Sequence, residues 1–556
     1  MNGELPLDRL YRWERERARV VFLTQPCGGG KLREWTWSQA ATEVRRVAGY
    51  LKAQNWEPGS RVAILSRNCA WWMMADLAIW MAGHVTVPIY PSLRAETVRH
   101  IVEHSESKAC FVGATDERDA VLAGLPPAVT PIRFPTAAAG GNEPDWETVV
   151  AASAPIEDNP TRAGDDLATI FYTSGTTGTP KGVMHRFSAF SFLASALIDR
   201  LGLAGEERIV SYLPLAHILE RAGEAIPAVL LGWHVFFAEG PETFVADMQR
   251  ARPTLFLSVP RLLAKFQQGV FEKVPRNKLD RLLRIPLLGR FVGKRVLRGL
   301  GLNAARCAAC GSAPLSLDLL TWYRKLGLNL IEGYGLTEAL ITHLTKPGRV
   351  RLGCVGSPLA GVESRRAANG ELLLKSPMNM IGYFKDPRGT ADAFTEDGFL
   401  HTGDLVEIED DGAVRIVGRL KEQFKTSKGK YVAPAPIEIR LAAHPDVESC
   451  CLMGSGLANP FAVVVLAAEG RARPRQAIEE ALGQLLDAVN AQLDYHERVG
   501  FIVIAEEPWT VANGLVTPTL KLRRSFLEQR YLARVAAWKR EGQRVLWEAE
   551  LQPRHA

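Results

Sequence analysis

The sequence predicts an α/β fold with a large N-terminal part and a smaller C-terminal part, and three observations support this prediction. A chain of 556 residues exceeds what one ordinary hydrophobic core organises, so two or more domains are expected. From Glu34 to Gly113, helix-type and strand-type apolar patterns alternate, which is typical of layered α/β folds. After Gly353 the apolar runs become short and are broken by glycines, which indicates a small β-rich subdomain.

The first predicted elements follow in the order helix, strand, helix, strand. They cover residues 40–53, 61–65, 71–82 and 85–90. Before them, Gly28 to Lys31 lies between two apolar runs and is interpreted as a hairpin turn rather than a phosphate loop. Residues 136–162 are rich in Ala, Gly, Pro and Glu with little periodicity, so we expect a surface connection there.

Further α/β units are expected to about residue 350, and a different pattern follows. Strands are expected at residues 371–374, 401–409, 412–417, 447–453, 461–468 and 501–505. A helix is expected over residues 474–493, and a last basic helix after Lys521. The later elements predict a separate α+β unit at the C-terminal end.

The composition is that of an ordinary soluble globular protein, with 47% hydrophobic and 23% charged residues. Neither a secretion signal at the N-terminus nor a membrane-spanning run is apparent, since the apolar residues 70–82 are too few, so we expect a cytoplasmic protein. The single CxxC, Cys307 to Cys310, has no second pair or nearby histidines and predicts a strand; a redox pair is the alternative.

The most informative stretch runs from Tyr172 to Gly182 and is dense in small and hydroxyl residues ahead of Lys181. It follows an apolar run, Leu167 to Tyr172, that predicts a strand. Backbone N–H groups, hydroxyls and one cation suit phosphate oxygens. Thr179 and Pro180 precede the lysine, so this is not a Walker A loop. A flexible turn is the alternative interpretation.

Three later motifs are read together with this loop: Glu332–Glu338, His401–Leu405 and Gly418–Glu422. In this order and at these separations, the chain resembles the adenylate-forming enzymes over nearly its whole length. Four more motifs are most similar to those of the long-chain fatty acyl-CoA synthetases. They are Tyr212–Arg221, Ser258–Arg261, Gly311–Leu315 and Thr517–Lys521. The resemblance implies activation of a medium- to long-chain fatty acid with ATP and Mg²⁺, release of pyrophosphate, and transfer of the acyl group to coenzyme A.

The resemblance also implies roles for individual residues. Those expected to bind ATP or AMP are Thr173, Ser174, Gly175, Thr176, Thr177, Gly178, Lys181, Gly311, Ser312, Ala313, Pro314, Glu332, Gly333, Tyr334, Gly335, Thr337, Asp404 and Arg419. Among them, Tyr334 would lie against adenine, and Asp404 with Arg419 would grip the ribose. Mg²⁺ would be held by Thr176 and Glu338, although a helix cap is the structural alternative for Glu338.

The catalytic residues implied by the resemblance are Lys521, Thr337, Glu338 and His217. Lys521, expected at the start of a helix, would bridge the substrate carboxylate and the α-phosphate. His217 and Tyr212 would line the acyl and adenylate pocket, with a satisfied core histidine as the alternative.

The resemblance further implies an adenylation domain over residues 1–417, which contains two layered α/β subdomains and the β-rich subdomain. A hinge at 418–421 with Lys421 as pivot would join it to a small, mobile α+β domain, 422–556. Gly429 and Lys430 would line the coenzyme A channel.

Two departures and one charged segment qualify these expectations. Ala339 to Ile341 replaces the small hydroxyl residue usual after the Thr-Glu pair, which leaves the acyl-chain preference open, and Gly311-Ser312 replaces the commoner Gly-Gly.

Residues 261–306 hold twelve lysines and arginines but only Glu272 and Asp280, a net charge of +10. Peripheral contact with an anionic membrane at the inner face is one interpretation, and a solvated basic face or one that draws in coenzyme A is the other.

Alternative functions stay open at this point. The first is a related adenylating ligase for an aromatic or polyketide-type acid, or one that delivers to a carrier protein. The second is a nonenzymatic lipid or nucleotide sensor on the same scaffold. No nucleic-acid partner and no obligate protein partner are expected.

Overall fold

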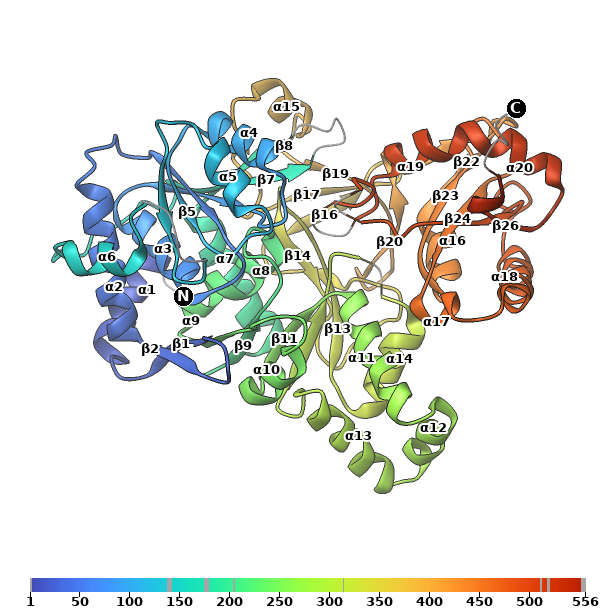
Figure 1. Ribbon diagram of the computed structural model, residues 1–556, viewed down its shortest axis with the longest axis horizontal. Coiled ribbons are helices and arrows are strands. Elements are labelled where there is room, and N and C mark those ends of the chain that lie inside the picture. Colours follow the sequence, from blue (N-terminus) through green and yellow to red (C-terminus); the bar gives the residue numbers. More distant parts are fainter. Residues whose placement is uncertain are drawn as a thin grey trace. The chain divides into compact units, whose positions relative to one another are not determined.

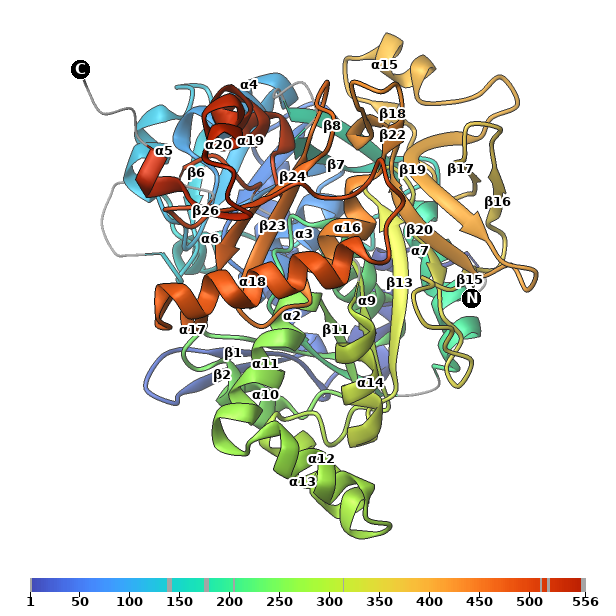
Figure 2. The same cartoon turned by 90° about the vertical axis from the view of Figure 1, so that its right-hand side faces the viewer.

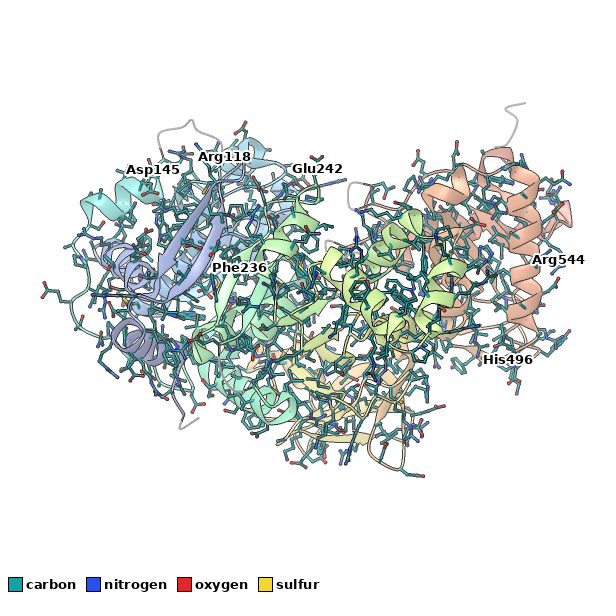
Figure 3. All side chains as sticks on the ribbon, turned by 90° about the horizontal axis from the view of Figure 1, so that it is seen from below. Arg118, Asp145, Phe236, Glu242, His496 and Arg544 are labelled. Atoms are coloured by element: carbon teal, nitrogen blue, oxygen red, sulfur yellow. The ribbon has the colours of Figure 1, made fainter. Side chains whose placement is uncertain are left out.

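The computed structural model describes residues 3–137, 143–174, 180–203, 206–313, 315–510, 513–517 and 521–551. Contacts between Cα atoms divide the chain into two compact units. The first comprises residues 1–365, 373–401 and 409–414, and the second comprises residues 366–372, 402–408 and 415–556. Arg118 and Asp145 mark the first unit in Figure 3, and His496 and Arg544 mark the second.

The first unit contains three sheets, which confirms the predicted α/β fold (Figure 1). Its largest sheet has seven strands in the order β18-β8-β7-β4-β3-β5-β6. Their bounds are β18 (Gly382–Tyr383), β8 (Pro180–Arg186), β7 (Leu167–Ser174), β4 (Val85–Ile89), β3 (Arg61–Leu65), β5 (Ser107–Val112) and β6 (Thr130–Arg133). The strands from β7 to β6 run parallel, whereas β8 and β18 are antiparallel additions at one edge.

Two smaller sheets complete the first unit. One has the order β2 (Leu32–Thr36), β1 (Val21–Pro26), β10 (His234–Phe237) and β9 (Arg208–Ser211). The other has the order β11 (Leu255–Ser258), β12 (Cys307–Cys310), β13 (Leu330–Leu336), β14 (Leu340–Leu344) and β15 (Ser357–Pro358). The predicted hairpin turn at Gly28 to Lys31 joins the antiparallel pair β1 and β2, and the CxxC residues form β12, as predicted.

Helices cover these sheets. They are α1 (Pro6–Glu16), α2 (Trp37–Lys52), α3 (Ala70–Met81), α4 (Ala95–Ser105), α5 (Arg118–Gly124), α6 (Trp146–Ala152), α7 (Phe187–Leu201), α8 (Ile218–Glu220), the π-helix η1 (Arg221–Ala225), α9 (Ile226–Leu231), α10 (Phe244–Ala251), α11 (Pro260–Lys273), α12 (Arg276–Arg284), α13 (Leu288–Gly299), α14 (Leu317–Leu326) and α15 (Pro387–Asp392).

One helix corrects the expectation of a surface connection over residues 136–162. Asp145 caps α6 by accepting the Thr148 N–H, and Trp146 is fully buried. The Trp146 indole N–H donates to Glu43, and its ring packs against Phe111 and Phe134. The aromatic anchor therefore fixes a segment whose composition suggested a loop.

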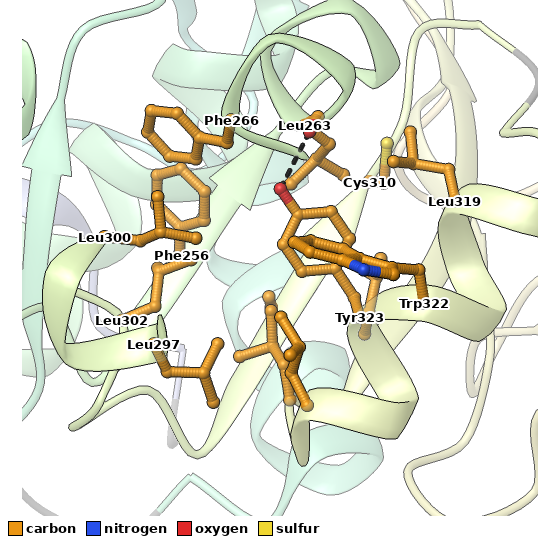
Figure 4. Packing of buried hydrophobic residues seen from close by; sticks show 14 of the residues in the cluster. Phe256, Leu263, Phe266, Leu297, Leu300, Leu302, Cys310, Leu319, Trp322 and Tyr323 are labelled. Carbon is orange, nitrogen blue, oxygen red and sulfur yellow. Dashed lines mark hydrogen bonds between the residues drawn. The ribbon is translucent and has the colours of Figure 1, made fainter. Parts of the chain in front are cut away.

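The core around β11, β12 and β13 is built by the helices that precede and follow them (Figure 4). Phe256, Leu263 and Tyr323 are buried together there, and the Tyr323 hydroxyl donates to the Leu263 carbonyl at 2.8 Å. Because this polar group is satisfied inside the cluster, the aromatic ring is buried without the cost of an unpaired hydroxyl.

A four-stranded sheet of β16 (Glu363–Arg366), β17 (Glu371–Lys375), β19 (Leu400–Ile408) and β20 (Val414–Arg419) follows, in that order, which agrees with the predicted β-rich stretch. After η2 (Leu420–Glu422), the hairpin β21 (Phe424–Lys425) and β22 (Tyr431–Val432) leads into the rest of the second unit.

The rest of the second unit has a four-stranded sheet, β23 (Val447–Met453), β24 (Phe461–Leu466), β25 (Ile502–Ile504) and β26 (Val545–Trp547). Its helices are α16 (Pro434–Ala442), α17 (Ala468–Arg471), α18 (Arg475–Asn490), α19 (Arg524–Tyr531), η3 (Leu532–Arg534), α20 (Val535–Glu541) and η4 (Glu548–Leu551). Figure 2 shows α18 along the face of this sheet. The strand β26 was not predicted from the sequence.

Candidate active site

The hairpin of β13 and β14 presents Thr337 and Glu338 at its turn. Gly335 makes the tight pairing possible, because a Cβ atom there would lie 2.1 Å from the Leu340 carbonyl oxygen. The helix-cap alternative for Glu338 is therefore wrong, since the residue lies in a β-turn rather than at a helix end. The small residue demanded at position 335 explains one glycine of the motif on structural grounds alone.

The backbone of the Thr-Glu pair is fixed from two directions. The His185 Nε2–H donates to the Thr337 carbonyl at 2.6 Å, and the Met380 N–H donates to the Glu338 carbonyl at 2.7 Å. His185 is fully buried, and this desolvation lowers its pKa to about 4, so the imidazole is neutral at physiological pH. The two side chains of the turn are thus carried by an anchored backbone.

Tyr383 connects Glu338 with Lys181, and the sequence did not point to it. Its hydroxyl donates to Glu338 Oε1 at 3.0 Å, and the Lys181 ammonium lies 4.7 Å from its ring centroid. The neighbouring Asp386 accepts from Lys181 at 3.1 Å and caps α15 by accepting the Gly389 N–H. Desolvation and the Glu338 carboxylate raise the pKa of Tyr383, which keeps its hydroxyl protonated as a donor.

This grouping follows from strand pairing. In β8, Lys181 lies opposite Thr173 of β7, while Val183, two residues on, lies opposite Tyr383 of β18. The antiparallel edge of the seven-stranded sheet therefore collects a cation, a phenol and two carboxylates. The signal for Tyr383 and Asp386 in the sequence is weak, because both lie some 200 residues from Lys181 and outside the motifs used for prediction.

Part of the predicted nucleotide loop lies outside the described residues, namely Gly175, Thr176, Thr177 and Gly178, as does Pro314. The strands on either side of the loop are described: β7 ends at Ser174, and β8 begins at Pro180, its pairing partner. The strand predicted before the loop is confirmed. Lys181 is half-buried at the start of β8.

The other predicted adenine-side residues lie at the ends of β12 and β13. Gly311 follows β12 and is buried, whereas Ser312 and Ala313 are exposed and Ser312 adopts a positive φ of 71°. Glu332 is 5% exposed, and burial raises its pKa to about 7. Across the hairpin, Tyr334 packs edge-on against His343, with ring centroids 5.8 Å apart, and Gly333 pairs with Leu344.

Two residues of the segment 212–221 have structural roles. The Tyr212 hydroxyl donates to the Leu257 carbonyl at 3.0 Å, so this polar group has a hydrogen-bond partner. His217 caps α8 by accepting the Leu219 N–H on Nδ1 at 3.1 Å, and its ring packs edge-on to Tyr90. The half-buried His217 is therefore held in place by a local bond.

Arg221, the last residue of that segment, is fully buried and pairs with Asp76 at 2.6 Å. Its guanidinium also donates to the Thr169 hydroxyl. This arginine thus ties α3 and β7 to the π-helix η1, and removing one partner of such a buried pair is strongly destabilising.

In the second unit, the structure brings Asp404 and Arg419 together. Asp404 lies in β19 and is buried, and its Oδ1 accepts from Arg419 Nε at 2.9 Å. The Asp404 N–H donates to the Thr402 hydroxyl, and the Gly403 N–H donates to Glu371. Adjacent strands of one sheet thus pair two residues that the sequence separates by fifteen positions.

Lys521 does not lie at the start of a helix, which corrects the expectation, because α19 begins only at Arg524. The Thr517 N–H donates to the Lys521 carbonyl at 2.8 Å, and the Lys521 N–H donates to the Thr517 hydroxyl at 3.0 Å. The lysine is exposed. Residues 518–520, between these two, lie outside the described residues.

The predicted pivot Lys421 and the predicted channel residues are exposed, whereas Gly418 at the start of the predicted hinge is buried. Lys421 lies in η2, and Gly429 and Lys430 lie in the turn that joins β21 to β22. Gly429 has a φ of 78°, and its N–H donates to the Thr426 carbonyl, so the turn itself demands a glycine there. This backbone requirement explains the glycine without reference to a ligand.

Glu338 is a suitable magnesium ligand by its chemistry. Mg²⁺ in nucleotide sites is held by one or two carboxylates together with phosphate oxygens. Among the described residues, there is no group of three or more His, Cys, Asp or Glu side chains that could hold a metal by itself. A single carboxylate beside Lys181 fits an ion that is completed by a phosphate-bearing ligand.

The chain matches two families that occur in tandem. Residues 10–384 match the family described as AMP-binding enzyme, and residues 421–538 match the AMP-binding enzyme C-terminal domain. The chain is 30% identical to the long-chain-fatty-acid–CoA ligase FadD15 of Mycobacterium bovis, over 90% of this chain and 92% of that protein. It is 28% identical to the human long-chain-fatty-acid–CoA ligase 1, over 94% and 85% of the two chains.

Solved structures share the fold. The adenylation domain of a carboxylic acid reductase from Segniliparus rugosus, in complex with AMP and a carboxylic acid, superposes with a TM-score of 0.80 at 22% identity, over 97% of this chain and 95% of that chain. The anthranilate CoA ligase AuaEII, in complex with anthranoyl-AMP, gives a TM-score of 0.79 at 21% identity, over 97% and 100%. The predicted fold of a large N-terminal and a smaller C-terminal domain is thereby confirmed.

Proposed function

The chain belongs to the AMP-binding enzyme family, and from this premise we propose that it joins a medium- to long-chain fatty acid to coenzyme A at the expense of ATP. A carboxylate oxygen attacks the α-phosphorus of ATP, the bond to the β-phosphate bridging oxygen breaks, and pyrophosphate leaves. The thiol sulfur then attacks the acyl carbon of acyl-AMP, AMP leaves, and the thiol proton passes to water or buffer. The curated relatives named as long-chain fatty acid ligases support this substrate class.

The arrangement of Lys181, Tyr383 and Glu338 carries the proposal. The Lys181 ammonium lies over the ring of Tyr383, and the Glu338 carboxylate accepts from its hydroxyl; a cation and a carboxylate so connected suit a polyphosphate and its metal ion. In this proposal, residues 173–181 bind the β- and γ-phosphates, and Thr337 binds the α-phosphate. Mg²⁺, when bound at Glu338 and Thr176, supplies positive charge to the phosphate oxygens.

The ribose is assigned to Asp404 and Arg419, and adenine to the segments 311–314 and 332–335. The ion pair holds the Asp404 carboxylate in one orientation, and a carboxylate is an acceptor that can take both hydroxyl groups of a vicinal diol. Arg419 would then contribute donors beside the same diol. These assignments, like that of His217 to the acyl pocket, rest on the resemblance together with the geometry.

The second half-reaction is assigned to the C-terminal part. We place the domain boundary at residues 417/418, a hinge at 418–421 with Lys421 as pivot, and the coenzyme A channel at Gly429 and Lys430. Lys521 would stabilise the adenylation transition state and then withdraw. The matched C-terminal family begins at residue 421, which is compatible with this division.

The test is a pyrophosphate-exchange assay with a panel of acids, followed by analysis of thioesters formed with and without coenzyme A. We expect exchange that requires Mg²⁺ and a fatty acid of medium or long chain. Formation of ADP and phosphate in place of AMP and pyrophosphate would overturn the adenylation chemistry. If the protein activates aromatic acids but no fatty acid, the substrate would be an aromatic acid instead. The structurally similar AuaEII is named as an anthranilate CoA ligase.

The hinge has a separate test. Lys421→Pro restricts φ in the predicted pivot, so acyl-AMP should still form while its transfer to coenzyme A slows. Single-turnover kinetics from ATP and acid, compared with kinetics from supplied acyl-AMP, separates the two steps. An equal loss in both would remove the hinge role from Lys421.

We also propose peripheral contact with an anionic membrane at the cytoplasmic face, where fatty acids partition. Among the described residues, no helix combines the length and the apolar character that a membrane crossing requires. The proposed contact is made by the protein surface, and the basic side chains of residues 261–306 would supply the attraction to anionic lipids.

A further inference from the structure

The two helices α12 and α13 form a pair at one end of the first unit, as both Figure 1 and Figure 2 show. Their inner sides belong to the core. Leu279 and Leu297 are buried in the cluster around β11 to β13, and Leu283, Val292 and Val296 pack against it. Leu283 therefore faces the core, whereas residues 284, 285, 287 and 288 are exposed.

The connection between these helices carries an apolar tip, which we define as Ile285, Leu287, Leu288 and Phe291. Leu287 is 79% exposed, Phe291 64% and Ile285 48%, and Leu287 is the most exposed large hydrophobic side chain in the described part of the chain. None of these four side chains belongs to the buried cluster around β11 to β13. Such a concentration within seven positions marks an interaction surface.

The backbone at the base of the tip is closely packed. A Cβ atom on Gly289 would lie 2.4 Å from the Leu283 carbonyl oxygen, and one on Gly293 would lie 2.5 Å from the Leu326 carbonyl oxygen of α14. Both glycines are buried at these close approaches. The base of the tip is therefore closely packed against α12 and α14.

Basic side chains surround the tip. Arg281, Arg284, Arg290 and Lys294 are all exposed, and within the part of the chain that the structure describes none of the four has an acidic side chain at ion-pairing distance. Arg281 and Ile285 also line an open hollow of about 460 Å³, together with Pro275, Asn277, Lys278 and Leu282. Unpaired guanidinium groups beside exposed apolar side chains complement an interface that is anionic at its surface and apolar beneath.

We infer that the α12–α13 tip docks on an anionic lipid bilayer, with Leu287 and Phe291 entering the acyl region and the surrounding cations contacting headgroup phosphates. The inference deepens the proposed membrane contact by naming its surface, and it is independent of the chemistry at the active site. Binding of a soluble polyanion such as coenzyme A would explain the basic side chains, but it would not explain why Leu287 and Phe291 are exposed beside them.

The test is flotation of the full chain with vesicles of phosphatidylcholine alone or with about 30% phosphatidylglycerol. We expect binding only to the anionic vesicles and a loss of binding at about 0.5 M salt. Leu287→Ser with Phe291→Ser should lower the bound fraction at least about fivefold, and Arg284→Glu with Arg290→Glu should do so to a similar extent.

Matched controls lie elsewhere on the first unit. Leu317→Ser removes another exposed leucine, 51% exposed, and Lys31→Glu reverses an exposed charge in the β1–β2 turn. Both should bind as the unaltered protein does. Adenylation of a freely soluble medium-chain acid should be unchanged in all four variants, so a failure of the proposed reaction would be seen separately from a failure of docking.

Equal binding to neutral and anionic vesicles, no binding to either, or full binding by the Leu287→Ser and Phe291→Ser protein would overturn the inference. Displacement from anionic vesicles by free coenzyme A at low concentration, with the serine variant bound normally, would assign the basic surface to that soluble ligand instead.

Discussion

Glu338 in the first unit and Lys521 in the second are held in different ways. Around Glu338, contacts join β8, β13, β18 and α15, which lie up to about 200 residues apart in the chain. The backbone of Lys521 is bonded to Thr517, four residues earlier: the Thr517 N–H donates to the Lys521 carbonyl, and the Lys521 N–H donates to the Thr517 hydroxyl. The difference teaches that Glu338 and Lys181 are joined by contacts between distant segments, whereas the described backbone bonds of Lys521 stay within its own segment.

This contrast suits a reaction in two steps. Preorganised charges stabilise a transition state without reorganisation, so they belong where ATP is held throughout. An exposed lysine can serve one step and leave the site for the next. The predictions below test that division, from the largest expected effect to the smallest.

Lys521→Ala would break the comparison most directly. Loss of the ammonium should slow adenylation about a thousandfold, because one preorganised charge at the reacting phosphate stabilises the transition state by several kcal/mol. Transfer from supplied acyl-AMP to coenzyme A should change little. Single-turnover kinetics of both steps provides the measurement, and Lys539→Ala, in α20 of the same unit, is the control. Equal slowing of both steps would show that Lys521 is structural.

Glu338→Ala tests the preorganised side. We expect pyrophosphate exchange to fall more than a hundredfold, because a carboxylate contact to the metal is lost at a phosphoryl centre. Binding of Mg²⁺-ATP, followed by calorimetry, should weaken while the unfolding free energy changes little. Retained nucleotide affinity would mean that another carboxylate holds the ion.

Glu332→Gln sharpens the comparison through pH. The buried Glu332 has a pKa of about 7, whereas in the unfolded chain it is close to 4.3. Between these values the folded protein holds a proton that the unfolded chain releases, so the free energy of unfolding falls as the pH rises and levels off above about 7.

Urea denaturation at pH 5 and pH 8 measures this fall. In the Glu332→Gln protein the loss of unfolding free energy between the two values should be smaller by about 2 kcal/mol. An unaltered pH dependence would place the titration on another group. Thr337→Ser, whose side chain does not titrate, is the matched variant on the same hairpin.

Tyr383→Phe gives the smallest expected effect. It removes the hydrogen bond to Glu338 and keeps the ring beneath Lys181, so pyrophosphate exchange should fall about tenfold, in line with the strength of a bond to a charged group. The Mg²⁺ concentration for half-maximal exchange should rise as Glu338 loses its orientation. Tyr431→Phe, on an exposed tyrosine, should leave both quantities unchanged.

Much of the fold could be predicted because local patterns of apolar and polar residues determine many of its helices and strands. The strand at Arg61 to Leu65 and the helix α3 follow from short apolar runs between polar turns, and the observed bounds agree to within one residue. The helix α6 could not be predicted in the same way, because its stability comes from Trp146 packing against strands that lie earlier in the chain. Leu283 likewise packs against the buried cluster because of tertiary contacts, which its neighbours in the sequence do not reveal.

The sequence by itself determined the α/β class, the family resemblance and the identity of Lys181, Glu338, Asp404 and Lys521 as candidates, since each stands in a compact motif. Only the tertiary structure decided that Tyr383 and Asp386 accompany Lys181, that Glu338 lies in a hairpin turn, and that Arg419 holds Asp404. The physical reason is that motifs record short-range chemistry, whereas these contacts arise when strand pairing brings distant residues within hydrogen-bonding distance.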